Sequence, residues 1–380
     1  MKARKAVKVL ATAGALTLVA AACGSSKKSD SASSGGKLTP VKLQLQWVAQ
    51  AQFAGYYAAV EKGYYKAAGL DVAILEAGVD TVPQKVLADG QVDFALAWVP
   101  KALASREAGA DIVNIGQIFQ RSGTLQVSFK DKNITKSADF KGKKVGTWGF
   151  GNEYEVYAGV TKAGLDPAKD VTLVQQQFDM KAMLAGEIDA AEAMTYNEYA
   201  QVLEAKNPKT SKLYTPEELN VVNYNNEGVG MLQDAIWANG KKLASDKAYQ
   251  DTATKLVKAT MQGWIFCRDN AQACADIVVA KGSKLGKSHQ LWQMNEINKL
   301  IWPSAKGIGS LDPAAWDNTV KIAQSTKNLE GKTVLTKAPA GKAFDMTYVD
   351  KALAELKKDK ADVEGVGFKP VTVTLAEGGA

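Results

Sequence analysis

Aromatic and amide side chains are concentrated between residues 44 and 57, which read QLQWVAQAQFAGYY. This stretch contains no acid, base, serine or histidine, so it lacks the groups that nucleophilic or acid–base catalysis requires. Aromatic rings instead stack on flat molecules, and glutamine amides both donate and accept hydrogen bonds. The segment therefore predicts a binding site for a planar molecule with polar edges. The predicted contacts are Trp47, Gln50, Gln52, Phe53 and Tyr57.

A second group of candidate ligand contacts stands near the ends of later strand-like segments. The segment GTWGFGNEYEVY, residues 146–157, has a glycine-rich turn that leads into a helix, where backbone N–H groups can approach a ligand. Glu198 follows another strand end and can accept a hydrogen bond from an exocyclic amine. The further predicted contacts are Trp98, Trp148, Gly149, Gly151, Asn152, Tyr154, Tyr196, Glu198 and Tyr224. Each of these predictions has a structural alternative: Trp47 can be a core residue, the glycines can form a plain tight turn, and Glu198 can be an ordinary acid in the first turn of a helix.

Catalytic, metal and cofactor motifs are scarce. The chain has one histidine, His289, and no Walker A sequence, and Tyr154 stands where the dinucleotide fingerprint needs its third glycine. We predict no catalytic residue, no metal and no cofactor. The carboxylates Asp179, Glu198 and Glu227 leave a hydrolase as a remote alternative. Two arginines, at positions 106 and 121, leave a sulfonate or nitrate binder as another.

The elements that must position these residues alternate along the chain from Pro40. VKLQLQW, LDVAILEA and VDFALAWV are strand-like, and FAGYYAAVEKGYYKAAG and TVPQKVLADG between them are helix-like. Such βαβαβ alternation predicts an α/β fold with a mostly parallel sheet covered by helices. Ligands of open α/β sheets bind beyond the carboxyl ends of the strands, which is where the candidate residues fall.

The same pattern recurs further along the chain. KLQLQW at 42–47 matches KKVGTW at 143–148, AGLD at 68–71 recurs at 163–166, and GQVD at 90–93 resembles GEID at 186–189. Shared turn chemistry explains each match singly, but the common order favours two similar α/β lobes. We predict lobe 1 from 40–124 and 228–380 and lobe 2 from 125–227, joined by a two-stranded hinge. A planar ligand would lie between the indole rings of Trp47 and Trp148.

The first 39 residues have the composition of a targeting segment. A basic start precedes an apolar run over 9–22 that is too short to span a bilayer, so residues 1–22 are predicted to be a signal peptide. Cys23 follows three alanines and resembles the lipid-attachment cysteine of bacterial lipoproteins; plain secretion with a free thiol is the alternative. Residues 23–39 are predicted to be a flexible Ser/Gly-rich tether. We thus expect an extracytoplasmic protein held at the cell membrane by a lipid anchor.

Charge and the remaining cysteines add two expectations. Removing residues 1–22 lowers the formal net charge from +7 to +3, and lysines alternate with acids elsewhere, so no nucleic-acid partner is predicted. Cys267 and Cys274 stand in WIFCRDNAQACADIVV. In one unbroken helix their Cα atoms would be about 10.5 Å apart, too far for a disulfide. A disulfide therefore requires a helix break at residues 268–270; two free thiols are the alternative.

Several segments together resemble a known family. QWVAQAQFAGYYAAVEKGYYKAAGLDV, GKKVGTWG, LAGEIDAAEA and TYNEY are similar to landmarks of NMT1/THI5-like solute-binding proteins, which serve bacterial ABC importers. The resemblance covers about residues 40–240. It implies a periplasmic-binding-protein fold of type II, a monomer, a small-molecule solute, an ABC permease as partner and no enzymatic activity.

The resemblance to this family also suggests classes of ligand. Its best-known members bind pyrimidine precursors of thiamine, and relatives bind riboflavin. Pyrimidine binders commonly show a Trp-x-Pro-Asn-x-x-His-x-Gly pattern. This chain keeps Trp47, but Gln50 stands near the asparagine position and Phe53 near the histidine position, which leaves room for a larger flat ring. A eukaryotic branch synthesises the pyrimidine with a cysteine-rich motif that this chain lacks.

Overall fold

The computed structural model describes residues 37–78, 80–149 and 151–380. The predicted signal peptide, Cys23 and residues 23–36 of the predicted tether lie outside the described residues. The first strand begins at Thr39, inside the segment predicted to be tether. Among the described residues, no helix is both long enough and apolar enough to cross a membrane.

The first of two five-stranded sheets contains strands from both ends of the described chain. Its order is β2 (Leu70–Leu75), β1 (Thr39–Gln44), β3 (Phe94–Trp98), β10 (Asp234–Asn239) and β4 (Ile112–Gln117). Strand β1 runs parallel to β2 and β3, whereas β10 lies antiparallel between β3 and β4. Every residue of β3, β4 and β10 is buried, as expected for strands that helices cover on both faces.

The second sheet repeats this arrangement. Its order is β7 (Thr172–Gln175), β6 (Lys144–Thr147), β8 (Ala190–Met194), β5 (Thr124–Phe129) and β9 (Leu219–Asn223). The parallel triplet β7-β6-β8 corresponds to β2-β1-β3, and an antiparallel strand follows the triplet in both sheets. The predicted α/β fold with two similar lobes is confirmed.

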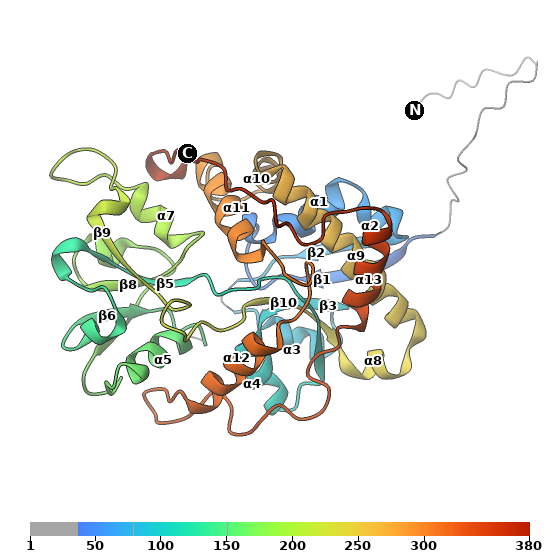
Figure 1. Ribbon diagram of the computed structural model, residues 1–380, viewed down its shortest axis with the longest axis horizontal. Helices are drawn as coiled ribbons and strands as arrows, with labels where there is room; N and C mark the ends of the chain where they lie inside the picture. The colour runs from blue at the N-terminus through green and yellow to red at the C-terminus, as the bar shows by residue number, and fades with distance from the viewer. Residues whose placement is uncertain (1–36, 79, 150) are drawn as a thin grey trace, which may run out of the picture. The chain divides into compact units, whose positions relative to one another are not determined.

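Helices cover both sheets, and Figure 1 shows the second-sheet elements gathered on one side and the C-terminal helices around the first sheet. The helices with the first sheet are α1 (Ala54–Glu61), α2 (Tyr64–Ala67), α3 (Pro83–Ala88), α4 (Val99–Glu107), α8 (Gly240–Ser245), α9 (Lys247–Asp269), α10 (Ala271–Ala280), α11 (Lys287–Ile301), α12 (Pro313–Ser325) and α13 (Thr347–Lys358). Those with the second sheet are α5 (Tyr154–Lys162), α6 (Lys181–Leu184) and α7 (Glu198–Leu203). Short 3-10 turns are η1 (Ala51–Phe53), η2 (Lys130–Lys132), η3 (Ser137–Phe140), η4 (Pro216–Glu218) and η5 (Glu377–Gly379).

Two segments connect the sheets, residues 118–123 between β4 and β5 and residues 224–233 between β9 and β10. The buried carboxylate of Glu155 accepts hydrogen bonds from both segments, from Ser122 Oγ at 2.9 Å and from the Met231 backbone N–H. Gln233 joins the two segments again, because its Oε1 accepts from Gly123 N at 2.8 Å. These crossings form the two-stranded hinge, and β5 already begins at Thr124, the last residue predicted for lobe 1.

Helix α9 anchors the helical tail to the first lobe. A Cβ on Gly55 of α1 would lie 2.2 Å from the Trp264 ring of α9, so the glycine permits this close packing. Helix α9 ends at Asp269 and α10 begins at Ala271, which is the break that a disulfide requires. The structure joins Cys267 to Cys274 by a disulfide, with Cα atoms 5.5 Å apart.

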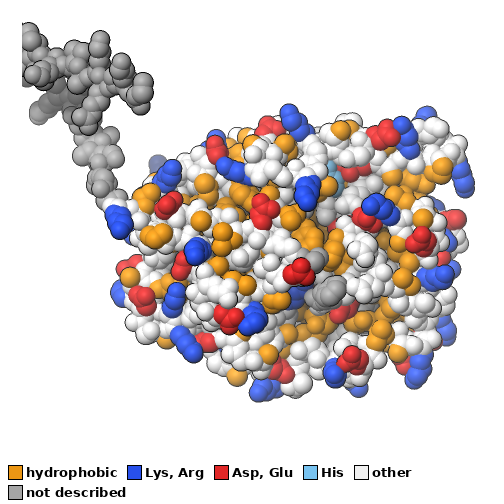
Figure 2. Space-filling view, turned by 180° about the vertical axis from the view of Figure 1, so that it is seen from behind, with side chains coloured by type: hydrophobic (Ala, Val, Ile, Leu, Met, Phe, Trp, Pro, Cys, Tyr) orange, Lys and Arg blue, Asp and Glu red, His pale blue; other side chains and the backbone are white. Residues whose placement is uncertain are grey.

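Charged side chains are mixed on the surface. Figure 2 shows basic and acidic groups interspersed over one face of the described residues, without a continuous basic stripe on that face. A surface of this kind gives no single-sign field to attract a nucleic acid.

Candidate functional site

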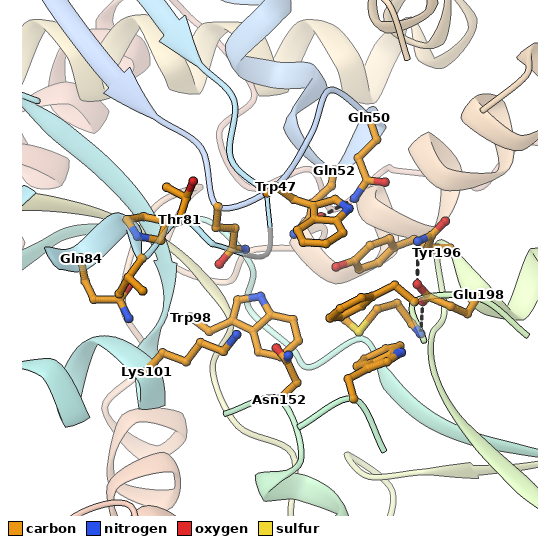
Figure 3. A pocket seen from close by; sticks show the side chains of 18 residues that line it. Trp47, Gln50, Gln52, Thr81, Gln84, Trp98, Lys101, Asn152, Tyr196 and Glu198 are labelled. Carbon is orange, nitrogen blue, oxygen red and sulfur yellow. Dashed lines mark hydrogen bonds between the residues drawn. The ribbon is translucent and has the colours of Figure 1, made fainter. Parts of the chain in front are cut away.

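A cavity of about 310 Å³ lies between the two lobes, beyond the carboxyl ends of β1, β3, β6 and β8 (Figure 3). Trp47 stands three residues after β1, Trp98 ends β3, and Trp148 directly follows β6. Residues after β8 form the remaining wall, where Tyr196 and Glu198 lie opposite Lys101 and Trp98 in the view of Figure 3. The topology thus brings the strand ends of both lobes to one cavity, as the rule for open α/β sheets predicts.

Eight of the predicted contact residues line this cavity. They are Trp47, Gln50, Gln52, Trp98, Trp148, Asn152, Tyr196 and Glu198. Their position is established by the structure, whereas their contact with a ligand stays a prediction.

The other predicted contacts do not line the cavity. Phe53 at the end of η1 and Tyr57 of α1 are buried in the same core, because η1 and α1 pack against the helices α9, α10 and α11. Tyr224 is buried in the second lobe, where its hydroxyl donates to Gln126 Oε1 at 3.1 Å. Tyr154 is half-buried and packs against a hydrophobic cluster that contains residues of both lobes. Each ring meets core side chains rather than the cleft.

Gly149 and Gly151 also stand behind the cavity wall rather than in it. Their φ angles are 72° and 82°, a left-handed conformation that favours glycine. A Cβ on Gly151 would lie 3.5 Å from Cε of Lys101, which belongs to the other lobe. The turn therefore brings backbone close to a cavity side chain, not directly to the cavity.

The sequence prediction missed several wall residues. They are Gln46, Gly78, Thr81, Val82, Pro83, Gln84, Lys101, Phe178, Met194 and Asn197. Lys101 lies in the first turn of the helix after β3, and Phe178 stands three residues after β7, as Trp47 does after β1. Applying the strand-end rule to every strand, not only to those ending in tryptophan, identifies both.

An aromatic cluster closes one side of the cavity. The Phe178 ring stacks on Trp148, with centroids 5.7 Å apart and planes 20° apart, and meets Trp47 of the other lobe at 5.0 Å. Phe178 thus contacts both indoles, and a ligand held between Trp47 and Trp148 stays a prediction. The lobes touch through this cluster, and the open volume lies toward Trp98 and Lys101.

A buried carboxylate, Asp234, organises the floor of the site. It lies at the start of β10 with 1% of its surface exposed and accepts from Gln46 Nε2 at 2.6 Å, Gln52 Nε2 at 3.1 Å and Trp98 Nε1 at 3.1 Å. Gln50 donates in turn to Gln52 Oε1 at 2.7 Å. Burial raises the Asp234 pKa to about 7, and these donors limit the rise. One carboxylate therefore orients three cavity side chains.

Lys101 is the cation of the cavity wall. Its ammonium lies 5.2 Å from the centroid of the Trp98 ring. Burial lowers the Lys101 pKa to about 8, against the opposing influence of Glu153, Glu192 and Asp234. An ammonium of this kind can donate to an acceptor on a ligand.

The second-lobe wall is held by two further carboxyl groups. Glu192 is fully buried and accepts from the Trp148 backbone N–H at 2.8 Å, which fixes the turn carrying the indole. Glu198, the first residue of α7, accepts from Met194 N at 2.9 Å and from Asn197 Nδ2 at 2.7 Å. Burial raises the pKa of both carboxyls, and the nearby His289 counteracts this for Glu198.

The described lining of the cavity contains few of the side chains that commonly act in catalysis. Among the lining residues that the structure describes there is no cysteine, histidine or serine. The described part of the chain also has no cluster of three or more His, Cys, Asp or Glu side chains arranged to hold a metal ion. His289 is completely buried next to the cavity wall and does not line the cavity.

Comparison with known proteins gives relatives whose names refer to thiamine biosynthesis or to a pyrimidine. A putative thiamine biosynthesis protein of Haemophilus influenzae is 26% identical over 221 residues, covering 58% of this chain and 68% of that protein. A formylaminopyrimidine-binding protein of Halalkalibacterium halodurans is 24% identical, covering 52% and 60%. A 4-amino-5-hydroxymethyl-2-methylpyrimidine phosphate synthase of Aspergillus parasiticus is 33% identical, covering 38% and 42%. The chain thus spans less than two thirds of the last two proteins.

Solved structures share the fold at low sequence identity. A putative periplasmic sulfonate-binding protein of Methylobacillus flagellatus superposes with a TM-score of 0.61 at 16% identity, covering 89% of this chain and 99% of that one. The periplasmic aliphatic sulphonate-binding protein SsuA of Escherichia coli gives 0.56 at 14% identity, covering 88% and 92%. These likenesses show the periplasmic-binding-protein fold. A family model described as NMT1/THI5 like matches residues 50–273, more than half of the chain, so this protein belongs to the NMT1/THI5-like family.

Proposed function

We propose that this protein is the extracytoplasmic solute-binding component of an ABC importer, and that it captures a planar nitrogen heteroaromatic molecule related to the thiamine pyrimidines. The observation that carries this proposal is the composition of the interlobe cavity. Three indole rings and one phenyl ring supply flat apolar surface, and Gln46, Gln50 and Gln52 supply amides that both donate and accept. A heterocycle with ring nitrogens and exocyclic amines presents the matching edges.

The volume of the cavity favours a small ring system. At about 310 Å³ it lies at the lower end of the roughly 300–1,000 Å³ range of ligand sites. The Phe178 ring packs against both Trp47 and Trp148, so it takes up space beside these indoles that a three-ring flavin would use. A pyrimidine-sized ligand is therefore proposed ahead of riboflavin.

An anionic ligand is the second candidate, because Lys101 places one cation in the cavity wall. Neither of the two arginines considered from the sequence is at the site. Arg121 donates to backbone carbonyls of residues 299–303, and Arg106 donates to those of residues 112 and 340. Among the described lining residues, sulfonate and nitrate would thus meet one ammonium and the Glu198 carboxyl group, which is why this candidate ranks second.

Binding without turnover is proposed, although relatives of this chain include pyrimidine phosphate synthases. The described lining residues offer no nucleophile paired with a base, which covalent catalysis would require. Another relative is named as a formylaminopyrimidine-binding protein. Ligand contact with both lobes would favour the closed form by population shift, and that form would engage the permease. We further propose lipid attachment at Cys23 and action as a monomer.

The test is a tryptophan-fluorescence titration of the purified protein, which has eight tryptophans. The probes are 4-amino-5-hydroxymethyl-2-methylpyrimidine, riboflavin, an alkanesulfonate and nitrate. The proposal expects saturable quenching or a spectral shift with the pyrimidine at the lowest concentration. Tighter binding of the sulfonate or nitrate would overturn it, as would chemical conversion of the pyrimidine during incubation.

A further inference from the structure

The one histidine of the chain joins the two lobes at the edge of the cavity. His289 is fully buried on α11, whose apolar residues Met294 and Ile297 pack with the first-lobe core. Its ring nitrogens meet two residues of the second lobe. Nδ1 lies 2.8 Å from Glu204 Oε1, and Nε2 lies 3.0 Å from Asn197 Oδ1. Figure 1 shows α11 and α7 close together near the C-terminal end of the chain.

The partners of this ring determine where its protons lie. An ionised carboxylate only accepts hydrogen bonds, so Nδ1 donates to Glu204. The Asn197 amide nitrogen donates to Glu198 Oε1 at 2.7 Å, so its carbonyl oxygen faces the histidine. With Glu204 ionised, Nε2 must therefore donate as well, which makes the ring an imidazolium between the Glu204 carboxylate and the Asn197 carbonyl oxygen.

The opposite orientation of the Asn197 amide would change the hydrogen-bonding role of Glu198 in the cavity wall. If the amide were turned over, its NH₂ group would donate to a neutral His289, and its oxygen would face Glu198. Glu198 would then have to carry the proton and would present a donor instead of a carboxylate. The hydrogen-bonded chain from Glu204 through His289 and Asn197 to Glu198 thus sets the polarity of the cavity wall.

We propose that His289 is a positioning residue of the binding site: as an imidazolium it orients the Asn197 amide and holds Glu198 as an acceptor for an N–H group of the ligand. Glu198 lines the cavity, whereas His289 acts only through Asn197. The ligand class is thereby narrowed to molecules that offer an exocyclic amine or a ring N–H at this wall. The ligand part of the inference rests on the proposed function; the protonation state of His289 does not.

The surroundings of the ring isolate it from water. The charged groups near it are Glu204 and Glu198 of the second lobe and, on the segment that covers the pair, Glu377, which is paired with Lys206 at 2.6 Å. The backbone N–H of Gly378 donates to the Glu204 carbonyl at 3.1 Å, and both Glu204 and His289 lie against Gly379. The pair is therefore covered on the side away from the cavity.

Lobe opening would separate His289 from the Glu204 carboxylate, which favours the imidazolium, and would expose the ring to water. Where the exposed ring is neutral, closing the lobes around a ligand takes up one proton. The proton belongs to the closed state, so affinity falls as the pH rises, by at most tenfold per pH unit for one proton. Replacing His289 removes this contribution to the pH dependence, whereas any contribution from Lys101 or Asp234 remains.

The first experiment is ¹⁵N NMR of the full-length protein, in which the single histidine gives one imidazole spin system. Spectra are recorded at pH 7.5 without additive and with 4-amino-5-hydroxymethyl-2-methylpyrimidine. The inference expects both ring nitrogens to be protonated when the lobes are closed. One unprotonated nitrogen in both samples would overturn it.

The second experiment measures the affinity for the same pyrimidine between pH 7 and pH 9.5. H289Q should bind more weakly at pH 7, and its affinity should fall less steeply with pH than that of the unmodified protein, by up to tenfold per pH unit. The matched control is W292F, which removes another α11 hydrogen bond to the second lobe, from Trp292 Nε1 to Thr195 O at 3.1 Å, but no titrating group.

The control should weaken binding and keep the pH slope. An unchanged slope in H289Q, or a flat profile in the unmodified protein, would refute the positioning role even if the variant is less stable. If the pyrimidine does not bind at any pH, the proposed function fails, while the ¹⁵N spectrum without additive still decides whether His289 is an imidazolium.

Discussion

Replacing Asp234 with asparagine should stabilise the fold at alkaline pH while weakening ligand binding. The carboxyl is 1% exposed, and burial raises its pKa from 3.8 to about 7. A carboxyl whose pKa is raised by folding destabilises the folded state once the pH exceeds the pKa of the unfolded chain. The penalty grows up to the folded-state pKa and is constant above it.

The size of the effect follows from the shift. About three pKa units at 1.36 kcal/mol each give a penalty of about 4 kcal/mol at pH 8. Asparagine removes the charge but turns an NH₂ group toward one of the three donors, which costs about 1–3 kcal/mol. The expected net gain at pH 8 is about 1–3 kcal/mol, and it disappears near pH 4 because the aspartate is then uncharged. Ligand affinity should fall by about tenfold because Gln52 and Trp98 lose a charged acceptor.

The assay is urea unfolding of both proteins at pH 4, 6 and 8, together with ligand titration at pH 8. The matched control is E155Q, because burial also raises the Glu155 pKa to about 7 but Glu155 bonds the hinge and does not line the cavity. E155Q should flatten the pH dependence of stability and bind ligand nearly as well as the unmodified protein. A D234N protein that is less stable at pH 8, or that binds ligand normally, would refute the reasoning.

Three further predictions concern the cavity wall and the scaffold. F178A should weaken binding of the pyrimidine by about tenfold and change the tryptophan emission. The reason is the loss of two ring pairs, Phe178 with Trp47 and Phe178 with Trp148, worth about 0.5–1.5 kcal/mol each. Unaltered emission would contradict the aromatic cluster. Gly151 and Gly164 have φ angles of 82° and 78°, so G151A and its control G164A should each lower the free energy of unfolding by about 1–2 kcal/mol. Only G151A should reduce affinity in a calorimetric titration, because the new Cβ lies against the side chain of the cavity lysine, Lys101. Equal ligand affinities of the two variants would argue against that contact. The double replacement of Cys267 and Cys274 by alanine should lower the free energy of unfolding by about 2–3 kcal/mol in urea and leave affinity unchanged; an unaltered unfolding midpoint would count against a bridge in solution.

The repeated segments explain why much of the fold was predictable. KLQLQW and KKVGTW lie at corresponding strands of the two sheets, because parallel strands with the same turn chemistry form the same local unit. The two crossings also followed from the sequence, since the second sheet is complete between residues 124 and 223. The exact end of β1 did not follow: the strand stops at Gln44, and the two residues between it and Trp47 continue as an irregular loop.

The site was predictable only in part, because several of its residues depend on long-range packing. Phe53 and Tyr57 share the aromatic stretch with Trp47, yet α1 turns their rings into the core. Asp234 is at the start of a strand, and its role appears only when the donors from residues 46, 52 and 98 meet it. His289 stands in the helical tail, 85 residues from Glu204, and no local pattern connects the two.

The central claim is that the interlobe cavity holds a planar nitrogen heterocycle, and native mass spectrometry of the protein as purified tests it most directly. The account predicts one bound molecule per chain, with a fragmentation pattern of an amino-substituted heteroaromatic ring, and its loss from a W98A variant that remains folded. A bound aliphatic sulfonate, or a heterocycle retained in full by W98A, would contradict the account.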